Sequence, residues 1–295
     1  ARLLALRAAL IGDAELGRSV IEERAAPATE EDLLRVHTAA HVAQVREAAE
    51  EAARTGRLAW IEDDTPVSAG SWEAALAAAG CAVAAAERVA AGAARRAFAL
   101  ARPPGQQAKA TLEQKRIELE AKRRLIATGR ARRVLVVDTD AHHGNGTQDI
   151  FYEDPSVYVL SLHLSPEYPG TGAAAERGVG PGAGATRNVP LPHGADGAFY
   201  RAQLAAALDA ALGEFAPELV LLSLGLDVLK GDPEGGFALG PADVHGLVSD
   251  LVARLPAPSG GRLAAVLEGG YALERIGAGF AAALRALAGL PPPGA

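Results

Sequence analysis

Apolar residues recur along this chain in two alternating patterns, short continuous runs and longer helical repeats. The short runs, rich in Val, Leu and Ala, predict buried strands at residues 97–101, 133–138, 157–162, 219–224 and 262–267. Apolar residues spaced three and four apart predict helices at residues 1–12, 30–54, 71–92, 109–128, 197–215, 241–254 and 273–289. Strands that alternate with helices need crossover connections. The pattern therefore predicts a single α/β domain over residues 1–295, built on a central, mostly parallel sheet.

Polar, ionisable residues follow directly after the strand predicted at 133–138. Asp138, Asp140, His142 and His143 stand within six residues of one another. Ligands of open α/β sheets bind beyond the carboxyl ends of the strands, which is where these side chains are expected. Asp140 and His142 are two residues apart, so in an extended chain they face the same side and can bind one metal ion. A plain polar loop is the alternative, but it would bring four such groups next to a core without pairing them.

Two later strands end in further polar residues. The run at 219–224 leads to Asp227, which adds a carboxylate from another strand end or, alternatively, caps a helix. Asp140, His142 and Asp227 would leave a metal position open for water or substrate, as catalytic zinc sites do. The strand at 262–267 is followed by Glu268-Gly-Gly-Tyr271. Tyr271 can donate a hydrogen bond to a developing oxyanion. A turn with a half-buried aromatic residue is the alternative interpretation of the same segment.

Composition limits the classes of function. The net charge of -7 over 295 residues excludes a basic footprint for nucleic acid. Cys81 is the single cysteine, which excludes a disulfide framework and favours a reducing compartment, the cytoplasm. We find no apolar run long enough for a membrane span. The Gly- and Pro-rich connection at 165–192 predicts a long irregular loop, either a wall of the site or a solvated surface segment.

Taken together and in chain order, these motifs resemble the zinc-dependent histone deacetylase superfamily and its bacterial acetylpolyamine amidohydrolase and acetoin-utilisation relatives. The matching segments are residues 31–37, 64–71, 98–105, 138–146, 168–172, 188–192, 225–233 and 268–271. The resemblance implies the three-layer αβα, arginase/deacetylase-like form of the fold. It also implies a preceding strand that this chain lacks, so the N-terminus is expected to be truncated.

The resemblance implies an activity and a set of sites. The activity is removal of acetyl groups from small-molecule or peptide amines, such as acetylpolyamines or acetyl-lysine, by water that one Zn²⁺ activates. Zinc would bind Asp140, His142 and Asp227, and Tyr271 would polarise the acyl carbonyl. The substrate channel would be lined by Tyr168, Gly269 and Gly270, with Asp63 or Asp64 at its rim. A structural K⁺ or Na⁺ ion would lie near a further set, namely Asp138, Asp140, His142, Ser161 and Leu162.

One segment departs from the family. Gln106 and Gln107 stand where the family carries two catalytic histidines, one of which Asp138 would orient. A glutamine amide has no useful pKa near neutrality and cannot transfer a proton. The channel-wall segment that follows is replaced by a charged helical stretch at 109–127, which predicts a surface helix or, alternatively, a docking helix for a partner.

Two other functions compete with an active zinc deacetylase. The glutamines favour a catalytically impaired relative that binds metal and acts as a binding or scaffold protein. A binuclear manganese ureohydrolase is disfavoured, because that family needs Asp-x-Asp where this chain has Gly225 and Asp227. The sequence leaves the acylated substrate and the oligomeric state open.

Overall fold

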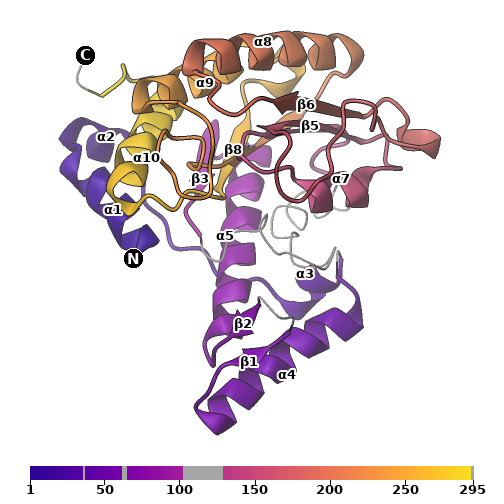
Figure 1. The fold of residues 1–295 in the computed structure, drawn as a ribbon, viewed down its shortest axis with the longest axis vertical. Coiled ribbons are helices and arrows are strands. Elements are labelled where there is room, and N and C mark those ends of the chain that lie inside the picture. The colour runs from indigo at the N-terminus through magenta and orange to yellow at the C-terminus, as the bar shows by residue number, and fades with distance from the viewer. Residues whose placement is uncertain (36, 62–64, 102–128, 294–295) are drawn as a thin grey trace.

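The protein is built on one six-stranded sheet. A computed structural model describes residues 1–35, 37–61, 65–101 and 129–293 (Figure 1). The strands lie in the order β3-β8-β7-β4-β5-β6, and every neighbouring pair is parallel. Their bounds are β3 Arg96–Ala99, β4 Val134–Asp138, β5 Val157–Leu164, β6 Thr186–Leu191, β7 Leu219–Leu224 and β8 Leu263–Leu267. The predicted parallel sheet is confirmed.

Helices cover both faces of this sheet, which explains why its central strands are continuously apolar. Leu219 and Leu221 of β7 pack in one cluster with α5 (Ser71–Ala90). Val220 and Leu222, which alternate with them, pack on the other face. That second face is covered by α1 (Arg2–Gly12), α8 (Gly197–Glu214), α9 (Pro241–Ala253) and α10 (Leu273–Ala288). The three-layer arrangement is therefore confirmed.

A smaller group of elements packs beside the far end of α5 (Figure 1). It consists of α3 (Glu30–Leu34), α4 (Ala39–Thr55), β1 (Ala59–Trp60) and β2 (Pro66–Val67). The single helix predicted at 30–54 is wrong, because it is divided into α3 and α4. The side chain of Thr38 accepts a hydrogen bond from the amide of His41 at 3.2 Å and so begins a new helix.

The sequence pattern also missed short elements. These are α2 (Ala14–Ser19), α7 (Asn145–Phe151) and the 3₁₀ turns Gly180–Gly182 and Ala257–Ser259. The connection at 165–192 is not wholly irregular, because it contains β6. This strand lies at the edge of the sheet, where Pro190 is tolerated although it lacks an amide proton. The sequence analysis missed β6 because its polar residues and its proline interrupt any continuous apolar run.

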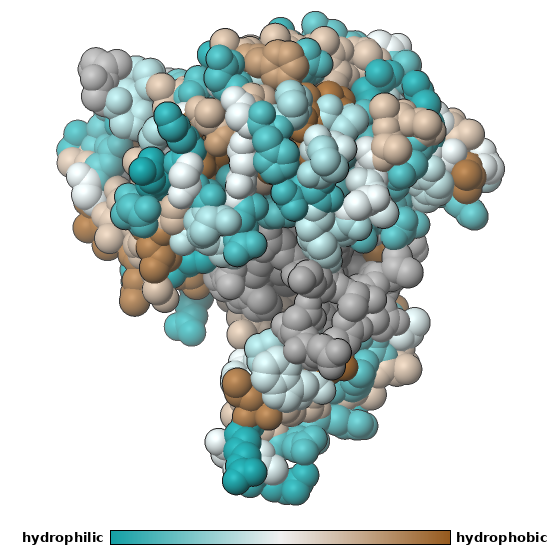
Figure 2. Space-filling view, in the orientation of Figure 1, coloured by the Kyte–Doolittle hydropathy of each residue, from teal (hydrophilic) through white to brown (hydrophobic). Residues whose placement is uncertain are grey.

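The described surface carries both polar and apolar side chains. The face in Figure 2 mixes hydrophilic and hydrophobic residues, with apolar ones gathered around α1, where Leu4 and Ile11 are exposed. Scattered exposed apolar side chains are ordinary on protein surfaces. In the described part of the chain, none of the helices combines the length and the apolar character that crossing a membrane requires.

Candidate metal centre and active site

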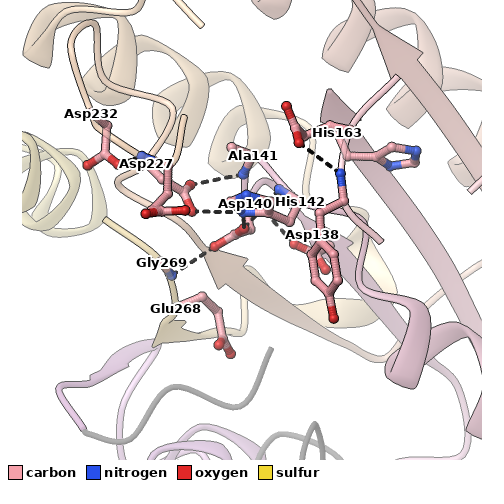
Figure 3. Close-up of polar contacts among 12 residues, drawn as sticks. Asp138, Asp140, Ala141, His142, His163, Asp227, Asp232, Glu268 and Gly269 are labelled. Atoms are coloured by element: carbon pink, nitrogen blue, oxygen red, sulfur yellow. Dashed lines mark hydrogen bonds and ion pairs between the residues drawn. The ribbon is translucent and has the colours of Figure 1, made fainter. Parts of the chain in front are cut away.

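Three adjacent strands deliver the predicted site residues to one edge of the sheet. β7 lies between β4 and β8, so the segments that follow these strands meet. Asp140 and His142 follow β4, Asp227 follows β7, and Tyr271 follows β8. Figure 3 shows the metal-ligand candidates converging there. The strand order thus brings together residues that are up to about 130 positions apart in the chain.

Asp140, His142 and Asp227 form a compact cluster of candidate metal ligands. One ligand atom from each lies within 4.8 Å of the others, and all three residues are buried. His142 Nδ1 is 3.1 Å from Asp140 Oδ1 and 3.4 Å from Asp227 Oδ2. The predicted convergence of these three residues is confirmed.

The donor set fits a divalent cation. Two fully buried carboxylates that share one imidazole place negative charge inside the protein, which is costly unless a cation compensates it. The carboxylates are also oriented by main-chain amides. Gly269 N donates to Asp140 Oδ2 at 2.8 Å, and Ala141 N donates to Asp227 Oδ1 at 2.9 Å. Two oxygens and one nitrogen suit zinc with an open fourth position.

The same arrangement shifts the protonation of the cluster. Burial alone would lower the pKa of His142, but hydrogen bonds and attraction from Asp140 and Asp227 raise it to about 10. Burial and repulsion from Asp140 raise the pKa of Asp227 to about 7. In the metal-free protein the imidazole is therefore protonated near neutral pH, although a metal ligand must be neutral.

We expect zinc binding to release more than one proton per chain near pH 7, because His142 must lose its proton and Asp227, whose pKa is about 7, is partly protonated there. Zinc affinity should accordingly rise with pH until His142 is deprotonated, at about pH 10. In the metal-free protein, the stability of the fold changes with pH in the opposite direction. The raised pKa of His142 stabilises the fold fully below pH 6.5, and this stabilisation is lost as pH rises through about 10. Calorimetric titration with zinc in buffers of different ionisation enthalpy measures the released protons. A binding heat that does not depend on the buffer would contradict this assignment.

The Glu268-Gly-Gly-Tyr turn lies directly against the metal cluster. Gly270 has φ +115°, and a Cβ there would approach Leu226 Cβ to 2.6 Å, so only glycine fits. Arg2 holds the same turn: its guanidinium donates to the carbonyl oxygens of Glu268 at 2.6 Å and Gly269 at 2.8 Å. It also lies 5.1 Å from the centre of the Tyr271 ring. Sequence reasoning missed Arg2, since no local pattern connects residue 2 with residue 271.

Tyr168, the predicted channel residue, lies next to the metal cluster. Its ring is 6.4 Å from the ring of His142 in an edge-on arrangement. Tyr168 belongs to the connection between β5 and β6, so part of this connection borders the site as predicted. Four other predicted positions, Asp63, Asp64, Gln106 and Gln107, lie outside the described residues, as does the helix predicted at 109–128.

The residues predicted around a monovalent cation also lie together. Asp138 of β4 is the register partner of Ser161 of β5, and Leu162 follows Ser161. Asp138 Oδ1 accepts the amide of Asp140 at 3.1 Å. The side chains of Asp138, Asp140 and Ser161 are all buried. Their proximity is what a shared ion would require.

Two further histidines, His143 and His163, hold the Tyr168 connection in place. His143 Nδ1 is 2.8 Å from Thr171 Oγ1, and its Nε2 is 3.2 Å from Gln148 Oε1. His163 Nε2 donates to Gly172 O at 3.0 Å. The two imidazole rings lie 4.7 Å apart. Gln148, which sequence reasoning missed, therefore helps to fix the wall that carries Tyr168.

The parallel sheet and the buried Asp/His/Asp cluster define an α/β protein with a candidate metal site at the carboxyl ends of its strands. The histone deacetylase domain model matches residues 1–287, and the chain belongs to this family. Its structure is similar to the crystal structure of the HDA15 HD domain, with a TM-score of 0.87 and 32% identity. That similarity covers 98% of this chain and 81% of the other.

Curated relatives match over about half of the chain. The acetylpolyamine amidohydrolase 1 of Pseudomonas aeruginosa is 43% identical over 150 residues, which are 50% of this chain and 42% of the relative. A probable deacetylase of Archaeoglobus fulgidus is 41% identical over 142 residues, or 48% and 40%. The chloroplastic histone deacetylase 14 of Arabidopsis thaliana is 37% identical over 158 residues, or 54% and 37%. The matched stretches thus span less than half the length of these relatives.

Proposed function

We propose that this chain is a zinc-dependent hydrolase that removes acetyl groups from amines such as acetyl-lysine or acetylpolyamines. The observation that carries the proposal is the buried Asp140, His142 and Asp227 cluster with Tyr271 on the neighbouring strand end, in a chain of the histone deacetylase family. Bound zinc supplies a Lewis acid for the acyl carbonyl and lowers the pKa of water in the open position. The name of the Pseudomonas relative supports an acetylpolyamine as one substrate class.

The protein's own residues orient the acetylated amine. Tyr168, beside His142, provides an aromatic wall for the alkyl chain that carries the acetyl group. Gly269 and Gly270 would line the channel through their backbone only. A Cβ at Gly269 would collide with the carboxylates of Asp140 and Asp227, and one at Gly270 would collide with Leu226. Tyr271 donates a hydrogen bond to the carbonyl oxygen as negative charge develops on it.

We further propose a K⁺ or Na⁺ ion bound by Asp138, Asp140, His142, Ser161 and Leu162. The proton arrangement at Ser161 supports this. His163 Nε2 donates to a carbonyl, and burial lowers the pKa of His163 to about 4, so its Nδ1 is an acceptor. The Ser161 hydroxyl therefore donates to His163 Nδ1 at 2.9 Å. Its oxygen keeps its lone pairs for a cation.

Two broader assignments complete the proposal. Residues 1–295 are proposed to form one catalytic domain, which the family match over residues 1–287 supports. A reducing compartment such as the cytoplasm is proposed from the single cysteine, Cys81. Two plant relatives are named chloroplastic, so targeting differs within the family.

We expect the chain as it stands to be a slow catalyst, and Gln106→His with Gln107→His to raise its rate by about tenfold or more. Hydrolysis of an amide needs a base for the attacking water and an acid for the leaving amine, because an amine anion is a poor leaving group. The glutamines provide neither. Steady-state kinetics of the zinc-loaded protein on acetyl-lysine peptides and acetylpolyamines measures the difference.

The same experiment tests the proposed function. Release of acetate by the double variant, abolished by a chelator and restored by zinc, supports a zinc deacetylase. Absence of turnover in both proteins, with zinc bound, would favour a metal-binding relative without activity. If the unaltered chain already turns over at about 1 s⁻¹ or faster, another group supplies the proton and our account of the glutamines is wrong.

A further inference from the structure

Asp232 is a buried carboxylate that contacts the backbone of the active-site tyrosine. It lies in the connection after β7 and is 7% exposed. Asp232 Oδ2 accepts the amide of Tyr271 at 2.6 Å and the amide of Ala272 at 2.9 Å. Its other oxygen accepts the amide of Glu234 at 3.1 Å. One side chain thus joins this connection to the start of α10.

The same connection carries the metal ligand Asp227, five residues earlier, and Figure 3 shows the two side chains close together. Asp232 lies between two tight turns: its amide donates to Leu229 O at 3.1 Å, and Gly235 N donates to Asp232 O at 3.3 Å. A Cβ on Gly235 would collide with the carbonyl oxygen of Asp227. The position of Asp232 is therefore fixed relative to the metal cluster.

On its N-terminal side, Tyr271 is held through Gly269. Gly269 N donates to the metal ligand Asp140, and Gly269 O accepts the amide of Leu226 at 3.0 Å. On its C-terminal side, the backbone is held by Asp232. The hydrogen bonds of Gly269 and those of Asp232 both connect the tyrosine backbone to residues in or beside the metal cluster. The distance from the tyrosine to the metal site therefore depends on both sets.

We propose that Asp232 is a positioning residue that sets where the Tyr271 hydroxyl stands relative to the metal. This inference rests on the proposed function, in which Tyr271 stabilises the oxyanion. Asp232 does not touch the substrate; it acts through the amides of Tyr271 and Ala272. The metal ligands do not depend on it, because amides of Gly269, His142 and Ala141 orient their carboxylates.

The test is a double-mutant cycle with two measurements. Asp232→Ala, Tyr271→Phe and the double variant are compared with the parent for the affinity of acetohydroxamate, by calorimetry on the zinc-loaded protein, and for kcat. This probe binds zinc and presents a carbonyl oxygen to Tyr271, so it needs no turnover. We expect Asp232→Ala to weaken both quantities by about tenfold to hundredfold with zinc stoichiometry unchanged. In the Tyr271→Phe background, the same substitution should add no further loss.

Two further variants separate positioning from general stability. In Asp232→Asn the amide oxygen can still accept from Tyr271 and Ala272, so affinity should stay within about threefold of the parent. Asp196→Ala is the matched control. Asp196 caps α8 by accepting the amide of Phe199 at 2.9 Å, so its loss should lower Tm and leave hydroxamate affinity unchanged.

The outcomes are distinguishable. If Tyr271→Phe changes neither affinity nor kcat, the oxyanion role of Tyr271 in the proposed function fails. If Tyr271→Phe lowers both but Asp232→Ala does not, or if the two losses multiply in the double variant, the positioning role is overturned. Should Asp232→Ala not fold, Asp232→Asn decides: a loss of tenfold or more there contradicts a role through hydrogen bonding.

Discussion

Asp227→Ala is expected to lose its bound zinc and all measurable hydrolysis with it. The substitution leaves Asp140 and His142 as the remaining candidate ligands, and two ligands do not hold zinc in a site that also needs open positions. The loss should not reflect unfolding. Burial and repulsion from Asp140 raise the pKa of Asp227 to about 7, and this cost offsets the attraction between Asp227 and His142 in the metal-free fold.

Mass-spectrometric metal counting measures this prediction directly. Zinc should raise the Tm of the parent but not of Asp227→Ala, since a ligand stabilises only a protein that binds it. Asp209→Ala is a matched control, because Asp209 is an exposed residue paired with Arg254. Unchanged zinc stoichiometry in Asp227→Ala would contradict the assignment of Asp227 as a zinc ligand.

Tyr271→Phe is expected to lower the residual rate by about 10²- to 10³-fold, the usual scale for one oxyanion donor. The ring should keep its place, because the contacts that fix it involve the backbone and the aromatic face. Asp232 accepts the amide of Tyr271, and Arg2 lies over the ring. Only the hydroxyl is removed, so zinc content and Tm should stay close to those of the parent.

Steady-state kinetics on the histidine-restored background gives the rate with the best precision, with Tyr152→Phe as a control at the end of α7. A reduced kcat with an unchanged KM indicates an interaction made mainly in the transition state. A variant that turns over as fast as its parent would show that Tyr271 is a packed aromatic residue without a chemical role.

Local sequence determined the sheet and the pair of candidate ligands that follows β4. Continuous apolar runs recur because strands covered on both faces bury every residue, and all five predicted strands lie within about two residues of their observed bounds. Asp140 and His142 are close because they are two residues apart directly after a strand. Such patterns depend only on neighbours along the chain, so they can be recognised in the sequence without a structure.

Strands with polar residues and helices with interruptions were harder to predict from the sequence. β6 was missed because an edge strand need not be apolar, and the division between α3 and α4 depends on a single cap at Thr38. The strand ends indicated Asp227 and Tyr271 but left alternatives open, and the resemblance to the family implied their roles. Their convergence with Asp140 follows from the strand order, in which β7 separates β4 from β8.

Tertiary structure alone decided what surrounds those residues. Arg2 contacts Glu268 across 266 positions of sequence, Gln148 joins His143 to the Tyr168 connection, and Asp232 holds Tyr271 from another loop. None of these residues belongs to a periodic pattern or carries chemistry on its own. Their effect depends on which loops the strand order brings together, and that order is set by packing of the whole sheet. The sequence by itself therefore determined the candidate metal ligands, whereas the folded chain determined how the tyrosine beside them is placed.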